Sequence, residues 1–279
     1  MASNEYAAFA AFYDRLTGNV DYTGLAGYLR DLFIRYGGAM PGTVLDLACG
    51  SGSLSLELAA DAEVVGVDAS SDMLALAADK VVSRGRPILF LRQDMRFLDL
   101  YGTVEGAVCV LDSLNHLLCT ADIRAVLRRL RLFLEPGGLF IFDVNTPFKH
   151  RVVLGDQAFV LEEGDLCCVW RNRYIPRTCE VAMTLDFFCQ TGAGGLYERL
   201  TDEVRERAYS EGTLRRLLAE EGFETLAVVG DRSFLPPKPE EERLVFVTRN
   251  TRTLEEARQG DGHKIHPSAY IGNSRSDRS

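Results

Sequence analysis

Two successive short apolar runs each carry an aspartate at or near the end. A loop of small residues follows the first of these runs. Asp46 belongs to the run Val44–Leu47, which continues into the loop Ala48-Cys49-Gly50-Ser51-Gly52. Glycines let a backbone approach a ligand closely, and the helix N-terminus behind such a loop offers free N–H groups to an anion. Asp68 ends the next apolar run, and an ionised carboxylate can accept from both hydroxyls of a ribose. The spacing predicts a nucleoside pocket at the carboxyl ends of adjacent parallel strands.

A nicotinamide cofactor is one alternative occupant of such a pocket. Its fingerprint is G-x-G-x-x-G, and here Ser55 occupies the position of the last glycine. That fingerprint also gives no role to Asp46, directly before the loop. We therefore disfavour a nicotinamide-dependent oxidoreductase.

The elements that would hold these residues alternate between strands and helices. An amphipathic helix is predicted from Thr120, with Ile123, Val126, Leu127, Leu130 and Leu134 on one side. Short apolar strands that alternate with such helices indicate a parallel sheet covered on both faces. The predicted strands are 44–47, 64–67, 88–91, 104–111 and 139–142, then 223–229 and 244–248, which form an antiparallel pair because no helix fits between them.

Residues 148–208 break this alternation. Val181, Met183, Leu185 and Phe187 recur at every second position, which is typical of an antiparallel strand with one buried face. The segment predicts an antiparallel β cap inserted in the α/β unit. Arg171, Arg173 and Arg177 lie in this insert, where they could meet an acidic substrate or an RNA phosphate.

Composition narrows the function further. The 279 residues carry 31 Lys and Arg against 40 Asp and Glu, a net charge of −9, which disfavours a general electrostatic grip on nucleic acid or an anionic membrane. The longest uncharged run is too short to span a membrane, and the N-terminal residues do not resemble a signal peptide. Seven cysteines without a C-x-x-C pair, and four histidines without metal-ligand spacing, predict a cytoplasmic protein with reduced thiols and no metal.

The string Val44–Gly52 resembles motif I of the class I S-adenosylmethionine-dependent methyltransferases. Four later segments resemble further motifs of that family in the same order: 64–68, 92–95, 111–116 and 134–138. The resemblance covers about residues 5–249. It implies a Rossmann-like sheet of seven mostly parallel strands with an antiparallel last strand. The N-terminal segments around Tyr13 and Tyr22 resemble the lid of a bacterial subgroup that acts on small molecules.

The resemblance also implies the contacts to S-adenosylmethionine. Asp46 and the loop Ala48, Cys49 and Gly50 would face the methionine part, with Tyr22 reaching its carboxylate. Asp68 would hold the ribose, Met73 would pack on the adenine, and Asp94 with the N–H of Met95 would bind the adenine edge. The carbonyl of Leu111 would point toward the methyl end. Ala48 departs from the glycine of many members, and alanine permits close approach if its φ is negative.

The residues that could assist the transfer are fewer. His116 is the candidate base because it follows the fourth strand and because histidine is the residue type suited to proton transfer near neutral pH. Tyr13 is a candidate for orienting the acceptor, as is Asp112. Cys49 has no identifiable base beside it, so we interpret it as a small loop residue and not a nucleophile.

These observations lead to one domain plan and one function. We predict lid helices over residues 1–40, a methyltransferase domain over 41–249 that contains the cap at 148–208, and a disordered tail at 250–279. We predict in-line methyl transfer from S-adenosylmethionine to a small-molecule acceptor. The alternatives are a tRNA or protein methyltransferase, and a protein that binds S-adenosylmethionine or its demethylated product without catalysis.

Overall fold

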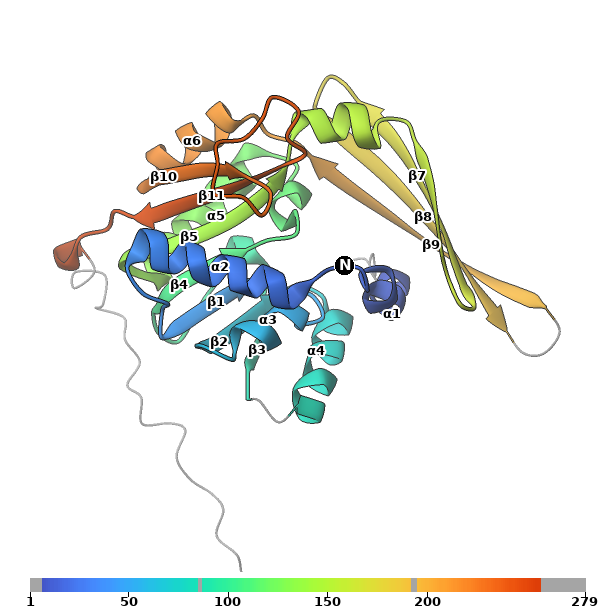
Figure 1. Cartoon of the computed structure of the whole chain (residues 1–279), viewed down its shortest axis with the longest axis horizontal. Coiled ribbons are helices and arrows are strands. Elements are labelled where there is room, and N and C mark those ends of the chain that lie inside the picture. The colour runs from blue at the N-terminus through green and yellow to red at the C-terminus, as the bar shows by residue number, and fades with distance from the viewer. Residues whose placement is uncertain (1–6, 85–86, 192–194, 257–279) are drawn as a thin grey trace, which may run out of the picture.

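A mixed sheet of seven strands forms the centre of the molecule. The computed structural model describes residues 7–84, 87–191 and 195–256 (Figure 1). The strand order is β10-β11-β5-β4-β1-β2-β3. The strands are β1 (Thr43–Leu47), β2 (Glu63–Asp68), β3 (Leu89–Arg92), β4 (Val104–Cys109), β5 (Leu134–Asn145), β10 (Phe223–Gly230) and β11 (Arg243–Asn250).

Strand directions match the sequence-based prediction. Neighbouring strands from β3 to β5 pair in parallel, whereas β11 pairs antiparallel with both β5 and β10. The predicted α/β fold with an antiparallel last strand is confirmed. The chain leaves β1 toward β2 on one side and later returns to β4 on the other, so the strand order reverses at β1. In open α/β sheets, ligands bind at such a reversal, outside the carboxyl ends of the strands.

Amphipathic helices cover both faces of the sheet. On one face lie α2 (Tyr22–Gly37) and α3 (Ser53–Leu58), and on the other lie α5 (Thr120–Phe133) and α6 (Glu211–Glu220). The stripe predicted for the helix from Thr120 is buried, as Ile123, Val126, Leu127 and Leu130 show. A further helix, α4 (Ser71–Arg84), packs beside β2 and β3.

The insert forms a second sheet of four antiparallel strands, which we call the cap. Its strands are β6 (Ala158–Glu163), β7 (Leu166–Ile175), β8 (Glu180–Thr191) and β9 (Leu196–Arg207), preceded by the helical turn η3 (Lys149–Leu154). The predicted alternation is confirmed, since Val181, Met183, Leu185 and Phe187 are all buried on one face. The cap extends away from the central sheet (Figure 1).

The two N-terminal helices take different places. Leu29, Leu32 and Phe33 of α2 are buried in the core beneath the sheet. The first helix, α1 (Ala7–Leu16), lies between the body and the cap, in contact with α4 and β9 (Figure 1). The lid predicted for residues 1–40 stays a prediction, and most of the predicted tail lies outside the described residues. Within the described ranges, no helix has both the length and the apolar character needed to cross a membrane.

Candidate active site

A small pocket lies at the carboxyl ends of β1 and β4, where the strand order reverses. It encloses about 40 Å³, roughly the space of one or two water molecules. Its walls come from motif I, from the segment after β4 and from the first two helices. Seven predicted site residues line it together: Tyr13, Tyr22, Asp46, Ala48, Cys49, Gly50 and Leu111.

Asp68 stands beside this pocket and supports the motif I loop. Its Oδ2 accepts the Gly50 N–H at 2.8 Å, and its Oδ1 accepts the Ser70 N–H at 2.8 Å. Burial raises the pKa of the Asp68 carboxyl, although these N–H groups oppose the shift. An ionised carboxylate has about four acceptor positions. Asp68 therefore keeps acceptor capacity for a further donor while it shapes the loop.

Ala48 differs from the sequence-based expectation. Its φ is +62°, so the condition of a negative φ is not met. A side chain in this left-handed region costs about 1–2 kcal/mol. The loop continues through Gly50 and Gly52, which both also take a positive φ.

Asp46 is the most deeply buried acid of the pocket, at 2% exposure. Burial raises its pKa to about 6, the charge of Asp68 adds to the rise, and the hydroxyl of Ser55 opposes it by donating to Oδ2 at 2.5 Å. The structure thus gives Ser55 a role that the sequence analysis did not assign. Asp46 forms no ion pair with any residue in the described part of the chain. Its carboxylate is a buried negative charge that lacks a cation.

The three residues predicted to bind adenine lie outside the enclosed pocket. Met73 is buried on α4, while Asp94 caps the short turn η1 (Met95–Phe97) after β3. Asp94 lies near Asp68, because the Gln93 N–H donates to the Asp68 carbonyl at 3.0 Å. The side chain of Asp94 accepts from the Arg96 guanidinium, with contacts from 2.5 to 3.1 Å, which lower its pKa. An adenine contact through Asp94 would share this carboxylate with Arg96.

Helix α1 covers one side of the pocket, which its Tyr13 lines. Tyr13 faces Gly50, and its hydroxyl is hydrogen-bonded with that of Tyr22. Burial raises the pKa of Tyr13 far above its ordinary value, so the phenol is protonated at neutral pH. The neighbouring Asp14 accepts from Lys80 of α4 at 2.7 Å and from Ser51 of motif I at 2.6 Å. No local sequence pattern predicts this attachment of α1 to the loop.

The segment after β4 has an unusual backbone. The predicted strand reaches Leu111, but β4 ends at Cys109, because Leu111 and Asp112 both take a positive φ, +56° and +58°. The carboxylate of Asp143 holds this conformation by accepting the Leu111 N–H at 2.8 Å and the Asp112 N–H at 2.7 Å. Arg243 donates in turn to Asp143 at 2.5 Å. No sequence motif pointed to Asp143 or Arg243.

Asp112 carries a stable negative charge at this bend. Burial alone would raise its pKa, but the charges of Arg243, Lys149 and His116 outweigh burial and bring the pKa down to about 2. Asn145 also donates to its Oδ2 at 2.7 Å. Asp112 is therefore ionised across the physiological range.

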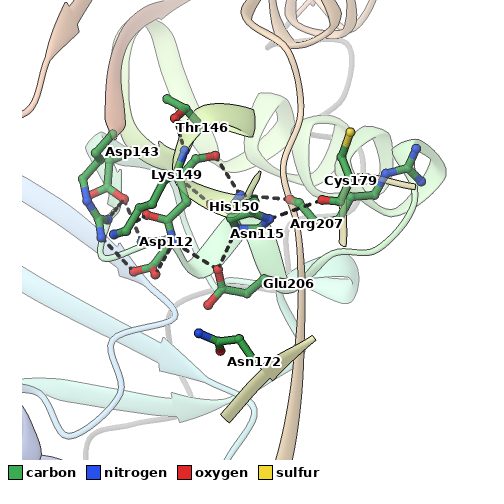
Figure 2. Close-up of polar contacts among 12 residues, drawn as sticks. Asp112, Asn115, Asp143, Thr146, Lys149, His150, Asn172, Cys179, Glu206 and Arg207 are labelled. Atoms are coloured by element: carbon green, nitrogen blue, oxygen red, sulfur yellow. Dashed lines mark hydrogen bonds and ion pairs between the residues drawn. The ribbon is translucent and has the colours of Figure 1, made fainter. Parts of the chain in front are cut away.

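Buried polar contacts join this bend to the base of the cap (Figure 2). The amide of Asn145, which contacts Asp112, also donates to Glu206 of β9 at 3.0 Å. Glu206 lies 3.2 Å from the fully buried ring of His150 in η3. Asn115, in the short helical turn η2 (Ser113–His116), donates to the backbone of Arg207 at 2.9 Å. The cap is thus fastened directly to the segment that lines the pocket.

His116, the predicted base, is exposed at the end of η2. It does not line the small pocket. It lies near enough to contribute to the lowered pKa of Asp112 and to oppose the raised pKa of Asp68. Ser113, at the other end of the same turn, does line the pocket.

Known proteins resemble this arrangement over nearly the whole chain. A family model described as a methyltransferase domain matches residues 44–138. YqeM of Bacillus subtilis, a protein named as a methyltransferase, is 31% identical over 89% of this chain and 98% of its own length. The crystal structure of an S-adenosylmethionine-dependent methyltransferase from Clostridium acetobutylicum shares 29% identity, covers 88% of this chain and 99% of that one, and has a TM-score of 0.79. The chain belongs to the S-adenosylmethionine-dependent methyltransferase family.

Two further similarities concern proteins with named substrates. The glycine/sarcosine N-methyltransferase of Parasynechococcus marenigrum is 29% identical to this methyltransferase, over 79% of this chain and 77% of its own. The amino pentose methyltransferase CalS10 of Micromonospora echinaspora shares its fold, with a TM-score of 0.68 at 22% identity over 88% of this chain and 97% of that one.

The pocket of this methyltransferase has groups that fit its cofactor, S-adenosylmethionine. The cofactor carries a positive sulfonium and an ammonium group, and the buried carboxylate of Asp46 lacks a cation. It also carries two ribose hydroxyls, and Asp68 retains free acceptor positions. The two carboxylates therefore match the family's cofactor, Asp46 in charge and Asp68 as a hydrogen-bond acceptor.

The left-handed alanine gives a first prediction. Ala48→Gly should stabilise the protein by about 0.5–1 kcal/mol, because the relief of the left-handed conformation exceeds the extra chain entropy of glycine. Urea unfolding at pH 7 measures the change. The matched control is Ala75→Gly on the exposed side of helix α4, which should destabilise by about 0.5–1 kcal/mol. Equal destabilisation by both substitutions would contradict the strain at Ala48.

Asp46 gives a second prediction, in the pH dependence of stability. Its pKa is raised from 3.8 to about 6 in the folded state, so its contribution to stability is present below pH 4 and is lost as pH rises through 6. Asp46→Asn removes this loss. The free energy of unfolding of the wild type should therefore fall relative to that of Asp46→Asn by about 2.4 kcal/mol between pH 4 and pH 7.5. Urea titrations at both pH values measure it, and a pH-independent difference would refute it.

Proposed function

We propose that this methyltransferase transfers the methyl group to a nucleophilic atom of a small molecule. The observation that carries the proposal is the enclosure of the pocket. Helix α1 is attached to motif I through Asp14. On its other side it contacts the cap, where Arg15 pairs with Asp165 at 2.7 Å and the ring centroids of Phe12 and Phe187 lie 5.4 Å apart. A site covered by a helix held at both sides favours a compact acceptor over a macromolecule.

The similar proteins support this class of acceptor. The names of two of the similar proteins specify glycine, sarcosine and an amino pentose. Each of these is a small molecule with an amino group. The net charge of −9 also disfavours the tRNA alternative.

We assign the following roles to the predicted residues. Asp46 and the loop Ala48, Cys49 and Gly50 hold the methionine end of the cofactor, with Tyr22 at its carboxylate. Asp68 holds the ribose, while Met73, Asp94 and Met95 contact the adenine. The carbonyl of Leu111 lies toward the methyl end. Because the enclosed space is only about 40 Å³, α1 and its Tyr13 shift outward when the cofactor enters.

Methyl transfer requires few catalytic groups from the protein. When bound, S-adenosylmethionine supplies a sulfonium methyl group that is already activated for in-line displacement. The chain must hold the acceptor in line, and such positioning contributes about 7–11 kcal/mol in favourable cases. Tyr13 donates its hydroxyl hydrogen to Tyr22, so it orients the acceptor by accepting a hydrogen bond at its oxygen. His116 is the candidate base for an acceptor that must lose a proton.

One set of observations supports a cytoplasmic location. All seven cysteines are free thiols in the structure. Burial raises the pKa of Cys49 far above its ordinary value, which keeps this thiol neutral beside the pocket. Reduced thiols are the rule in the cytoplasm.

The role of Asp68 can be measured directly. Asp68→Ala should weaken S-adenosylmethionine binding by about 1–3 kcal/mol, because it leaves ribose hydroxyls without their acceptor. Isothermal titration calorimetry measures the change. The matched control is Glu63→Ala, which removes the same charge from the exposed, opposite end of β2 and should leave affinity unchanged. Equal affinities for wild type and Asp68→Ala would place the ribose elsewhere.

The acceptor class requires a separate assay. The protein is incubated with methyl-labelled S-adenosylmethionine and with three fractions of a bacterial extract: small molecules, RNA and protein. We expect label in the small-molecule fraction alone. Label in RNA or protein would establish the macromolecular alternative. Tight cofactor binding with no transfer to any fraction would favour the non-catalytic alternative.

A further inference from the structure

A second, larger cavity lies beyond the cofactor pocket. It has a volume of about 640 Å³ and lies between His116 and Leu118 on one side and strands β7, β8 and β9 of the cap on the other. The short turn η2 separates the two spaces, since Ser113 lines the cofactor pocket and His116 lines the cavity. This adjacency allows one molecule to reach from the cavity toward the reacting centre.

Strand register places two arginines opposite each other on the cavity wall. Arg173 of β7 pairs with Ala182 of β8, and Ala182 pairs with Arg205 of β9. The three side chains therefore form one row on the same face. Two strand spacings separate the arginines by about 10 Å. The small alanine between them leaves the floor of the row open, so both guanidinium groups can converge on one ligand.

The two arginines of this row are weakly engaged by the protein. The side chain of Arg173 makes no hydrogen bond or ion pair with the residues that the structure describes. Arg205 has one carboxylate partner, Glu180, at 4.0 Å. The neighbouring Arg171 is different, because Asp186 holds it at 2.6 Å. The free donors of the wall are thus those of the Arg173–Arg205 row.

The charge of the wall favours an anion. Arg171, Arg173 and Arg205 line it with one acid, Glu203, and the charge of Arg171 is matched by Asp186, so Arg173 and Arg205 carry the positive charge of the wall. A concave surface of this sign, on a chain with a net charge of −9, concentrates negative ligands locally. Guanidinium groups bind phosphate and carboxylate oxygens through paired hydrogen bonds.

We propose that this cavity is the acceptor subsite, and that Arg173 and Arg205 bind a phosphate or carboxylate group of an anionic acceptor. The assignment rests on the proposed function and deepens it. The anionic group lies on the cap, and the nucleophile reaches past His116 toward the methyl group. The two arginines thereby select acceptors that carry such a group and hold them in position.

Calorimetry with simple anions tests the subsite. Inorganic pyrophosphate and succinate are titrated separately into the full-length protein saturated with S-adenosylhomocysteine, so that the two arms distinguish phosphate from carboxylate. At least one anion should bind, and its affinity should fall as salt rises. Arg173→Gln should weaken that binding at least tenfold, and Arg205→Gln at least threefold.

Two controls separate this inference from the proposed function. Arg177→Gln removes the same charge from an exposed position in the turn after β7, outside the cavity, and should leave anion affinity unchanged. S-adenosylhomocysteine affinity should be the same in all variants, which shows that they fold. Absence of binding by both anions, or equal loss in Arg177→Gln, would overturn the subsite while cofactor binding stood. Failure of S-adenosylhomocysteine to bind would instead overturn the proposed function.

Discussion

The carboxylate of Asp143 holds together the part of the structure on which the site depends. It accepts two consecutive backbone N–H groups, those of Leu111 and Asp112, and its charge is matched by Arg243. Without these bonds, two non-glycine residues in left-handed conformation would relax toward an extended strand. The bend directs the segment after β4 across the carboxyl end of β1, so the pocket, η2 and the cavity all take their positions from one buried ion pair.

Acidic and basic side chains occupy different sides of this bend. The acids Asp46, Asp68 and Asp112 lie at strand ends around the pocket. The cations that stabilise Asp112, namely Arg243 and Lys149, lie on the side of the cap base and β11. No cation pairs with Asp46 in the described part of the chain, and burial raises the pKa of its carboxyl. A pocket lined in this way attracts a cationic ligand, whereas the arginine row on the cap attracts an anionic one. The two spaces on either side of η2 therefore have opposite electrostatic preferences.

Local sequence was sufficient for the strands, the cap and most of the pocket. Asp46 and Asp68 could be placed because short apolar runs predict parallel strands, and the ends of such strands meet at one edge. The bend at Leu111 could not be predicted, because its cause, Asp143, lies 32 residues farther along the chain. The conformation of Ala48 depends on the closure of its loop. The place of Arg205 beside Arg173 follows only from its register with Ala182, which no local sequence pattern predicts.

The position of η2 also bears on the order in which the two ligands bind. It separates a pocket closed by α1 from a cavity bordered by the cap, so the two ligands reach the reacting centre by different routes. In the proposed arrangement, the acceptor would exchange through the cavity, which is lined by η2 and the cap strands. Movement of α1 to admit the cofactor would break the contacts of Phe12 and Arg15 with the cap. Cofactor entry would therefore loosen the sheet that holds the acceptor, which favours binding of the cofactor before the acceptor.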